Sequence, residues 1–201
     1  MSGAFVARTR ERLRDEVLAA AEAALEARGW RGLRMVEIAE TVGVSRQTLY
    51  NEFVNKTALA RALALKVSGE FVDEIMASMQ TADDPLRFWR DAVHYTLERA
   101  ATDRRMKALL GADGIDSFLP IFTSDGHPMI DQTGGRMGPA ICRRWPELDP
   151  VRVAEATDAT SRLIISYVVL PGEPVDVVAD RIAGLAVAYL KAPEQLIRPS
   201  G

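Results

Sequence analysis

Cysteine is almost absent from this chain of 201 residues: Cys142 is the only one, so no disulfide can form within it. Such cysteine usage is typical of a reducing cytoplasm, where we expect the protein to reside. No run of about 18 or more apolar residues occurs, and the opening MSGAFVARTRERLRDE has no long apolar stretch. The sequence therefore predicts neither a membrane span nor a signal peptide.

Residue types that commonly carry catalysis are scarce too. His94 and His127 are the only histidines, and the motifs G-x-S-x-G, G-x-x-x-x-G-K-[ST] and H-E-x-x-H do not occur. Cys142 precedes Arg143 and Arg144, a setting in which a thiol can be redox-sensitive. A half-buried structural thiol is the simpler interpretation, and we predict no catalytic residue and no cofactor.

One stretch of the sequence has the composition of a metal site. Asp113, Asp116, Asp125, His127 and Asp131 offer carboxylates and one imidazole, which would suit a hard or borderline cation. The glycine-rich composition of residues 111–128 instead favours a solvated loop with a helical turn or two. We therefore predict no metal site.

The charge of the chain is unevenly distributed. The net charge is −3 and the pI about 5.5, which taken globally argues against a nucleic-acid binder. Residues 1–66, however, contain 11 Lys and Arg against 8 Asp and Glu, whereas the remaining residues contain 14 against 20. A mildly basic front on an acidic body indicates two functions in one chain.

Apolar residues recur with helical spacing along nearly the whole chain, and no strand-like alternation of useful length occurs. Capping residues, glycines and prolines mark the helix ends. We expect Thr9 to cap the first helix and Gly29 to end it. The fold class predicted is all-α with about nine helices, at residues 9–28, 35–42, from Ser45 through the YNEF segment, 55–79, 85–101, 103–110, 128–145, 150–170 and 174–192.

Two short helices separated by Gly43 form a predicted helix-turn-helix. In VGVSRQTLYNEF, Leu49 and Phe53 are four residues apart and face the core, while Val44 and Leu49 can form a hydrophobic staple. The polar side chains on the other side of this helix are left outside, where they suit phosphates and base edges of DNA. They are Arg46, Gln47, Thr48, Tyr50 and Asn51. The alternative is a solvated helix face, because helix-turn-helix geometry also occurs in proteins that never bind DNA.

A longer pattern covers residues 9–66. The first helix ends in ARGW and is followed by RGLRMVEIAETVGVSRQTLYNEFVNKTALARAL, with Gly-Val-Ser at the turn and a lysine before the long fourth helix. In this pattern the chain resembles TetR-family transcriptional regulators. The resemblance implies a homodimeric repressor whose recognition helices enter successive major grooves of a palindromic operator in double-stranded DNA, roughly 34–36 Å apart.

The second helix departs from the family. Where the family has Ser or Thr at its start, this chain has Arg34, so the capping bond is lost, and Val36 stands where a polar residue is common. Arg34 can still reach a phosphate. The DNA-binding residues that we predict are Arg34, Ser45, Arg46, Gln47, Thr48, Tyr50, Asn51 and Lys56.

The family layout implies a DNA-binding domain at residues 1–55, continued by the start of the fourth helix to about residue 66, and an effector-binding and dimerisation domain at residues 56–201. The helices at 150–170 and 174–191 are apolar around more than half of their circumference, which favours a four-helix bundle between two subunits. The alternative is burial inside a monomer. The interface residues that we predict are Leu163, Tyr167, Val178, Ile182, Leu185 and Tyr189.

Large and adaptable apolar side chains lie on the segments expected to surround the middle of the second domain, with Gly134, Gly135 and Gly138 leaving room beside them. They predict an apolar effector, lipid-like or aromatic. An all-α carrier or enzyme that retains a structural helix-turn-helix is the alternative. The pocket residues that we predict are Phe71, Ile75, Met79, Trp89, Val93, Leu97, Met106, Leu110, Phe118, Phe122, Met129 and Met137.

Overall fold

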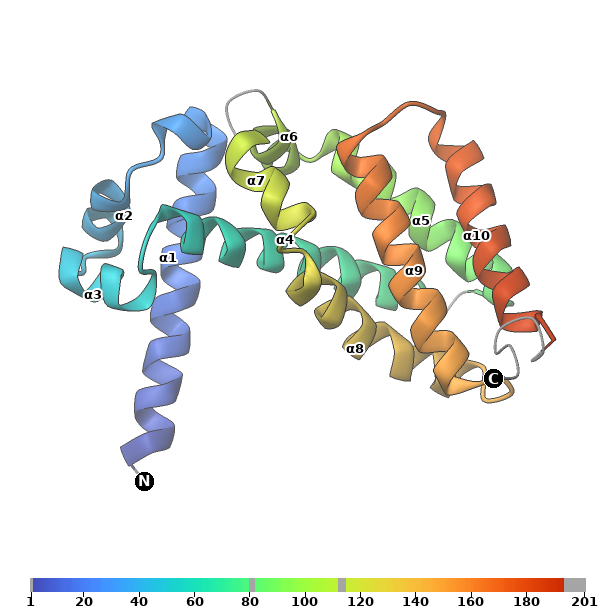
Figure 1. Cartoon of the computed structure of the whole chain (residues 1–201). Coiled ribbons are helices and arrows are strands. Elements are labelled where there is room, and N and C mark those ends of the chain that lie inside the picture. The colour runs from blue at the N-terminus through green and yellow to red at the C-terminus, as the bar shows by residue number, and fades with distance from the viewer. Residues whose placement is uncertain (1, 80–81, 112–114, 194–201) are drawn as a thin grey trace. The chain divides into compact units, whose positions relative to one another are not determined.

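The computed structural model describes residues 2–79, 82–111 and 115–193, and these residues form helices and no strands (Figure 1). The all-α prediction is thereby confirmed. Within the same ranges, no helix combines the length and hydropathy that a membrane span requires. The helices are α1 (Ser2–Gly32), α2 (Met35–Val42), α3 (Arg46–Glu52), α4 (Lys56–Ser78), α5 (Pro85–Thr102), α6 (Arg104–Leu110), α7 (Ile115–Phe122), α8 (His127–Arg144), α9 (Pro150–Val169) and α10 (Val175–Lys191).

The first helix begins earlier than predicted. It starts at Ser2, and the hydroxyl of Thr9 donates to the carbonyl oxygen of Phe5 at 3.0 Å inside the helix, so Thr9 is not its cap. Gly29 interrupts the helix where expected, with a φ of 69° that glycine adopts without strain, and the chain continues helically to Gly32. The sequence therefore predicts the interruption correctly and the start incorrectly.

The starts of several later helices follow their sequence signals. Side-chain oxygens of Asn55, Asp84, Asp103 and Asp149 accept hydrogen bonds from backbone N–H groups in the first turn of the following helix, at 2.8–3.3 Å. These N–H groups have no partner inside the helix. The four caps therefore fix where α4, α5, α6 and α9 begin.

The glycine-rich region is more helical than predicted. We expected a loop with a helical turn or two here, but α7 occupies Ile115–Phe122. A helix forms because it places Phe118 and Phe122, four residues apart, on one face, and both are buried. α8 runs close to its predicted range despite its three glycines. A Cβ atom built on Gly134, Gly135 or Gly138 would meet nothing within 4 Å, so open space lies beside this helix.

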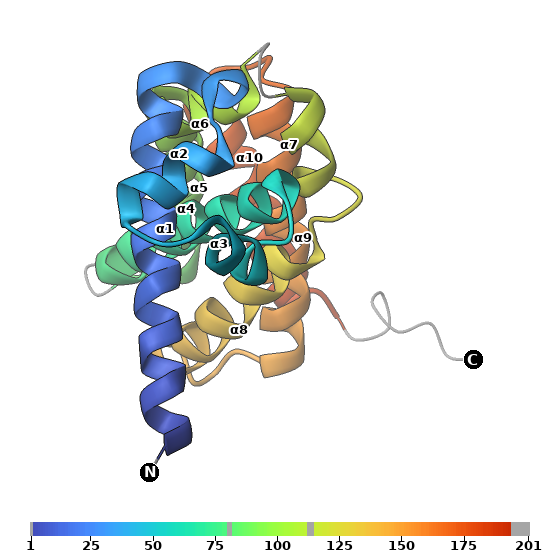
Figure 2. The same ribbon diagram turned by 90° about the vertical axis from the view of Figure 1, so that its left-hand side faces the viewer.

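The chain divides into two compact units. Unit 1 comprises residues 1–66 and 103–121, and unit 2 comprises residues 67–102 and 122–201. In unit 1, α1 packs against α2 and α6, and α2 packs against α3 (Figure 2). α6 therefore belongs with the helix-turn-helix, although it follows α5 in the chain.

A partly buried ion network ties α6 into unit 1. Glu22 of α1 accepts a hydrogen bond from Lys66 of α4 at 2.6 Å and also pairs with Arg105 of α6. Arg105 in turn binds Asp103, with Nη2 and Oδ2 2.9 Å apart. The side chains of Glu22, Arg105 and Asp103 are at most 15% exposed. Mutual pairing offsets the cost of removing these charges from water.

Unit 2 is built on α5, α9 and α10, which pack against one another, with α8 against α9 (Figure 1). Its buried side chains form two clusters. The larger joins α4, α5, α8, α9 and α10, and the smaller joins α5 to α10 through Val93, Leu97, Val178, Ala179 and Ile182.

Candidate nucleic-acid interface and effector region

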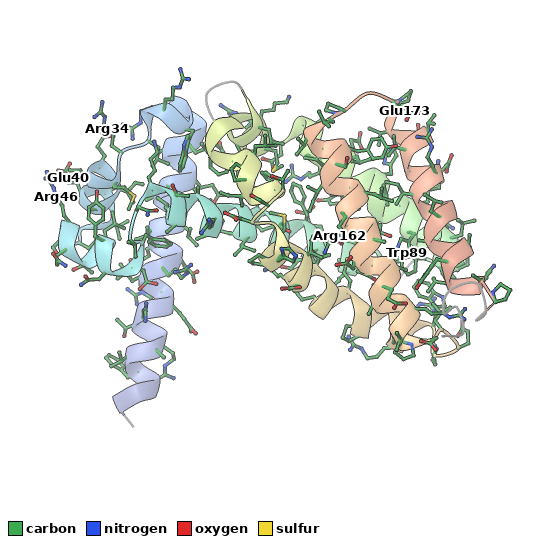
Figure 3. All side chains as sticks on the ribbon, viewed as in Figure 1. Arg34, Glu40, Arg46, Trp89, Arg162 and Glu173 are labelled. Carbon is green, nitrogen blue, oxygen red and sulfur yellow. The ribbon has the colours of Figure 1, made fainter. Side chains whose placement is uncertain are left out.

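α3 presents a polar face on a buried apolar anchor. Leu49 and Phe53 are each 1% exposed, as the spacing predicts. Ser45, Arg46, Gln47, Tyr50 and Asn51 are exposed, and Thr48 is half-buried. Figure 3 shows the side chains of Arg34 and Arg46 directed away from the ribbons of α2 and α3. The polar groups that the sequence singles out thus lie on one accessible surface.

Internal hydrogen bonds order this face. The hydroxyl of Ser45 accepts from the backbone N–H of Thr48 at 3.0 Å and lies 2.8 Å from the Thr48 hydroxyl. The amide nitrogen of Gln47 donates to Oδ1 of Asn51, one turn later, at 2.9 Å. Ser45 is therefore an N-cap as well as a candidate DNA contact, and the amides of Gln47 and Asn51 form a hydrogen-bonded pair on the exposed face of α3.

Glu52 is the one acidic residue of α3, and α1 neutralises it. Nε of Arg10 and Nη1 of Arg14 donate to its two carboxylate oxygens at 2.7 and 3.0 Å, and its side chain is 7% exposed. Burial acts to raise the pKa of this carboxyl, but hydrogen bonds from Arg10 and Arg14 outweigh burial and hold it below its ordinary value. The pairing fixes α3 on α1 and removes a charge that would repel phosphates.

Sequence reasoning missed this role of Arg10 and Arg14. Their spacing of four residues places both on one face of α1 and was the available signal. It does not by itself identify Glu52 as the partner, since the two positions are joined only by the tertiary fold.

Lys56, a predicted phosphate contact, also has a structural role. Its ammonium donates to the carbonyl oxygen of Trp30 at 2.6 Å and lies 4.4 Å from the centroid of the indole. Burial, and then the nearby charge of Arg34, lower the pKa of Lys56. Arg34 precedes α2 without making a capping hydrogen bond, as its sequence predicts.

The two C-terminal helices expose apolar side chains. Leu163 is 36% exposed and Leu185 is 55% exposed, whereas Val178 and Ile182 are each 1% exposed and lie in the chain's own core. Tyr167 and Tyr189 are half-buried, and their hydroxyls bind Arg181 and Glu155. Of the predicted interface residues, the two leucines are thus the most available to a second subunit. Other exposed apolar residues of these helices and the loop between them are Val151, Leu170 and Val177.

The predicted pocket residues fall into separate groups. Ile75, Met79, Trp89 and Met137 share the larger cluster of unit 2, and Val93 and Leu97 share the smaller one. Phe71 lies edge-on to Tyr95, with ring centroids 6.4 Å apart. Phe122 and Met129 are buried residues of unit 2. The remaining three, Met106, Leu110 and Phe118, belong to unit 1. There Phe118 lies edge-on to Trp30, with the two ring centroids 4.6 Å apart.

The two other candidate sites remain without structural support. Asp113 and the side chain of Asp116 lie outside the described residues, and among the residues that are described no group of three or more His, Cys, Asp or Glu is placed to hold a metal ion. Cys142 is half-buried against the larger cluster of unit 2, as expected of a structural thiol.

Two family models match this chain. The model of bacterial regulatory proteins of the tetR family matches residues 17–63, and the model of the bacterial tetracyclin repressor C-terminal domain matches residues 84–188, more than half of the chain. The chain belongs to the TetR family. It is therefore a transcriptional regulator rather than an enzyme.

Relatives along most of the length support this membership. HTH-type transcriptional regulator AlkX of Mycobacterium tuberculosis is 29% identical over 182 residues, which are 90% of this chain and 86% of AlkX. The crystal structure of the TetR-family repressor AlkX from Dietzia sp. strain DQ12-45-1b is 29% identical, with a TM-score of 0.77, covering 89% of this chain and 95% of that one. RolR in complex with resorcinol shares the fold at 18% identity and a TM-score of 0.67, covering 93% and 97%.

The two TetR-family matches fall on different parts of the structure. The N-terminal match contains α2 and α3 whole, and with them the polar face. The C-terminal match starts just before α5 and ends within α10, so it includes α8 and α9. The helix-turn-helix and the C-terminal helices are thus matched by separate family models.

Proposed function

We propose that this TetR-family regulator is a homodimeric repressor that binds a palindromic operator through α3 and is released by an apolar effector bound in unit 2. In this proposal residues 1–55, continued by the start of α4 to about residue 66, form the DNA-binding domain, and residues 56–201 bind the effector and hold the dimer.

The main support for the DNA-binding part of the proposal is the ordered polar face of α3. Leu49 and Phe53 anchor the helix, Ser45 caps it, and Glu52 is neutralised by α1. Arg46 then suits guanine, and the Gln47–Asn51 amide pair suits adenine. Arg34 and Tyr50 suit phosphates, which position a protein without reading sequence.

The exposed leucines of α9 and α10 support the dimer. Leu163 and Leu185 lie on helices whose other faces already pack within unit 2. Joining two such helices from each subunit would bury these side chains in a four-helix bundle. The two recognition helices of a dimer then match the two half-sites of a palindrome.

The chemistry of the effector is inferred from the core and from one relative. The larger cluster of unit 2 contains Met79 and Met137, and methionine adapts to irregular apolar ligands. The Dietzia AlkX repressor is described as implicated in the biodegradation of n-alkanes. An effector with a long apolar body fits both observations.

Footprinting on DNA from upstream of the protein's own gene tests the proposal. We expect two protected half-sites about 34–36 Å apart, with two subunits or a multiple bound per site. Medium-chain alcohols and acids, added at rising concentration, should abolish the protection. Protection of a single half-site by a monomer, or protection that no apolar compound affects, would contradict the proposal.

A further inference from the structure

One buried side-chain oxygen in unit 2 has no hydrogen-bond partner. Among the described residues, Oε1 of Gln132 on α8 is the single side-chain nitrogen or oxygen that is closed off from solvent and has no partner. Buried polar atoms are almost always paired with protein or water, because an unpaired one is costly. Such an exception calls for a missing partner that donates a hydrogen bond.

The amide of Gln132 is placed by the packing of α8 on α4. A Cβ atom on Gly69 of α4 would lie 3.1 Å from Nε2 of Gln132, closer than side chains normally approach. One turn further along α8, Arg136 donates from Nη1 to the carbonyl oxygen of Gly69 at 3.1 Å and pairs with Asp73. Gly69 thus leaves the room that Gln132 occupies, and Arg136 holds the two helices together there.

The same two helices supply apolar surroundings. Val72 and Ile75 of α4 share the larger cluster of unit 2 with Met137 and Ile141 of α8. Gly138 is itself buried, yet a Cβ atom built on it would meet nothing within 4 Å. α8 therefore carries one unpaired polar oxygen and, six residues later at Gly138, a buried position with open space beside its backbone.

We propose that Gln132 binds the single polar head group of the effector, and that this head group donates a hydrogen bond to Oε1. The inference rests on the proposed function and narrows it: the effector is an apolar chain or ring with a hydroxyl group. A carboxylic acid meets the requirement only in its protonated form, which burial favours. Ethers and hydrocarbons of the same shape lack the donor.

Matched ligands test the role of Gln132. We would titrate the full chain calorimetrically with 1-decanol and with 1-methoxydecane, which keeps the apolar body but cannot donate. The wild-type protein should bind decanol roughly three- to tenfold more tightly than the ether. In Gln132→Met, which keeps the side-chain length without the amide, the two affinities should become equal. Equal affinities in the wild type, or an undiminished preference for decanol in the variant, would overturn the proposal.

Decanoic acid tests the direction of the hydrogen bond. Its binding to the wild type should strengthen from pH 7.5 to pH 5.5, because the protonated form is the donor, whereas decanol binding should not change with pH. Stronger decanoate binding at pH 7.5 that Gln132→Met abolishes would overturn the assignment of an accepting oxygen.

Two further measurements separate this site from a structural role and from the proposed function. Without ligand, Gln132→Met should unfold at the same temperature as the wild type or higher, because it removes an unpaired buried polar group. A lower unfolding temperature, with the ligand preference intact, would make Gln132 structural. Operator binding without ligand should be unchanged in the variant, so a wild-type protein that binds no operator would refute the repressor proposal while leaving the ligand result to stand.

Discussion

The ammonium of Lys56 donates a hydrogen bond to the carbonyl oxygen of Trp30 at 2.6 Å and lies 4.4 Å from the centroid of the indole ring. It thereby joins the start of α4 to the end of α1, beside the kink at Gly29. Lys56, which the sequence predicts only as a DNA-binding residue, thus also stabilises the domain that carries α3.

Replacing Lys56 should therefore affect stability as well as DNA binding. Lys56→Ala removes one hydrogen bond and one cation–π contact, which together contribute about 1–2 kcal/mol to the free energy of unfolding. Urea unfolding measures this loss. Arg46→Ala is the matched control, because Arg46 is exposed on α3. We expect it to weaken DNA binding with almost no change in unfolding. Equal stability of the two variants would show that the Trp30 contact contributes nothing.

Ser45 allows the capping role to be separated from the DNA-binding role. Ser45→Ala should cost about 1 kcal/mol of stability, because the backbone N–H of Thr48 loses its acceptor. Ser45→Asp keeps an acceptor and should retain the stability, but its negative charge should weaken DNA binding by about tenfold or more. Calorimetric unfolding and DNA titration of both variants check this. An unimpaired Ser45→Asp would place the DNA elsewhere.

Glu52 should make the stability of unit 1 depend on acid. Because its pKa is lower in the folded protein than in the unfolded chain, its ion pairs stabilise the fold above the ordinary glutamate value of about 4.3. That contribution is lost as the pH falls through the lowered pKa. Glu52→Gln should be roughly 1–2 kcal/mol less stable at pH 7, with the difference shrinking toward pH 3.

The control for this prediction is Glu16→Gln, which breaks the exposed pair between Arg12 and Glu16. Exposed pairs of this kind contribute about 0.3–0.5 kcal/mol. Urea unfolding at several pH values compares the two variants. A difference for Glu52→Gln that stays constant from pH 7 to pH 3 would show that the carboxylate pairing is not its source.

The dimer proposal makes its own prediction. Leu185→Asp should shift the protein toward monomer in analytical ultracentrifugation and reduce its affinity for DNA, since a charge would be buried in the interface. Leu86→Asp on α5, where the leucine is 47% exposed against 55% for Leu185, should do neither. A dimer that survives Leu185→Asp would place the interface on another surface.

Local signals were sufficient for much of the fold and for one face of the site. The helix starts after Asn55, Asp84, Asp103 and Asp149 are encoded by caps a few residues away, and the spacing of Leu49 and Phe53 determines which side of α3 is exposed. The prediction that Thr9 caps the first helix was wrong, because a threonine hydroxyl inside a helix can instead donate to the carbonyl oxygen four residues earlier, here that of Phe5.

Other features depend on contacts between distant segments, which periodicity cannot reveal. The pairing of Glu52 with Arg10 and Arg14, the Trp30–Lys56 contact and the unpaired oxygen of Gln132 all belong to this class. The unit to which a helix belongs is also of this kind. Met106 lies in unit 1, where the Glu22–Arg105 network holds α6, and Phe118 of α7 lies in unit 1 as well, with its ring centroid 4.6 Å from that of Trp30.

The central claim is that the polar face of α3 reads a specific DNA sequence. Fluorescence anisotropy with labelled DNA from upstream of the protein's gene, at several salt concentrations and with excess unrelated DNA, tests it most directly. We expect binding that resists the competitor, falls linearly with the logarithm of salt concentration, and weakens in Tyr50→Ala without loss of helical circular dichroism. Binding that the competitor abolishes, or that Tyr50→Ala leaves unchanged, would contradict the claim.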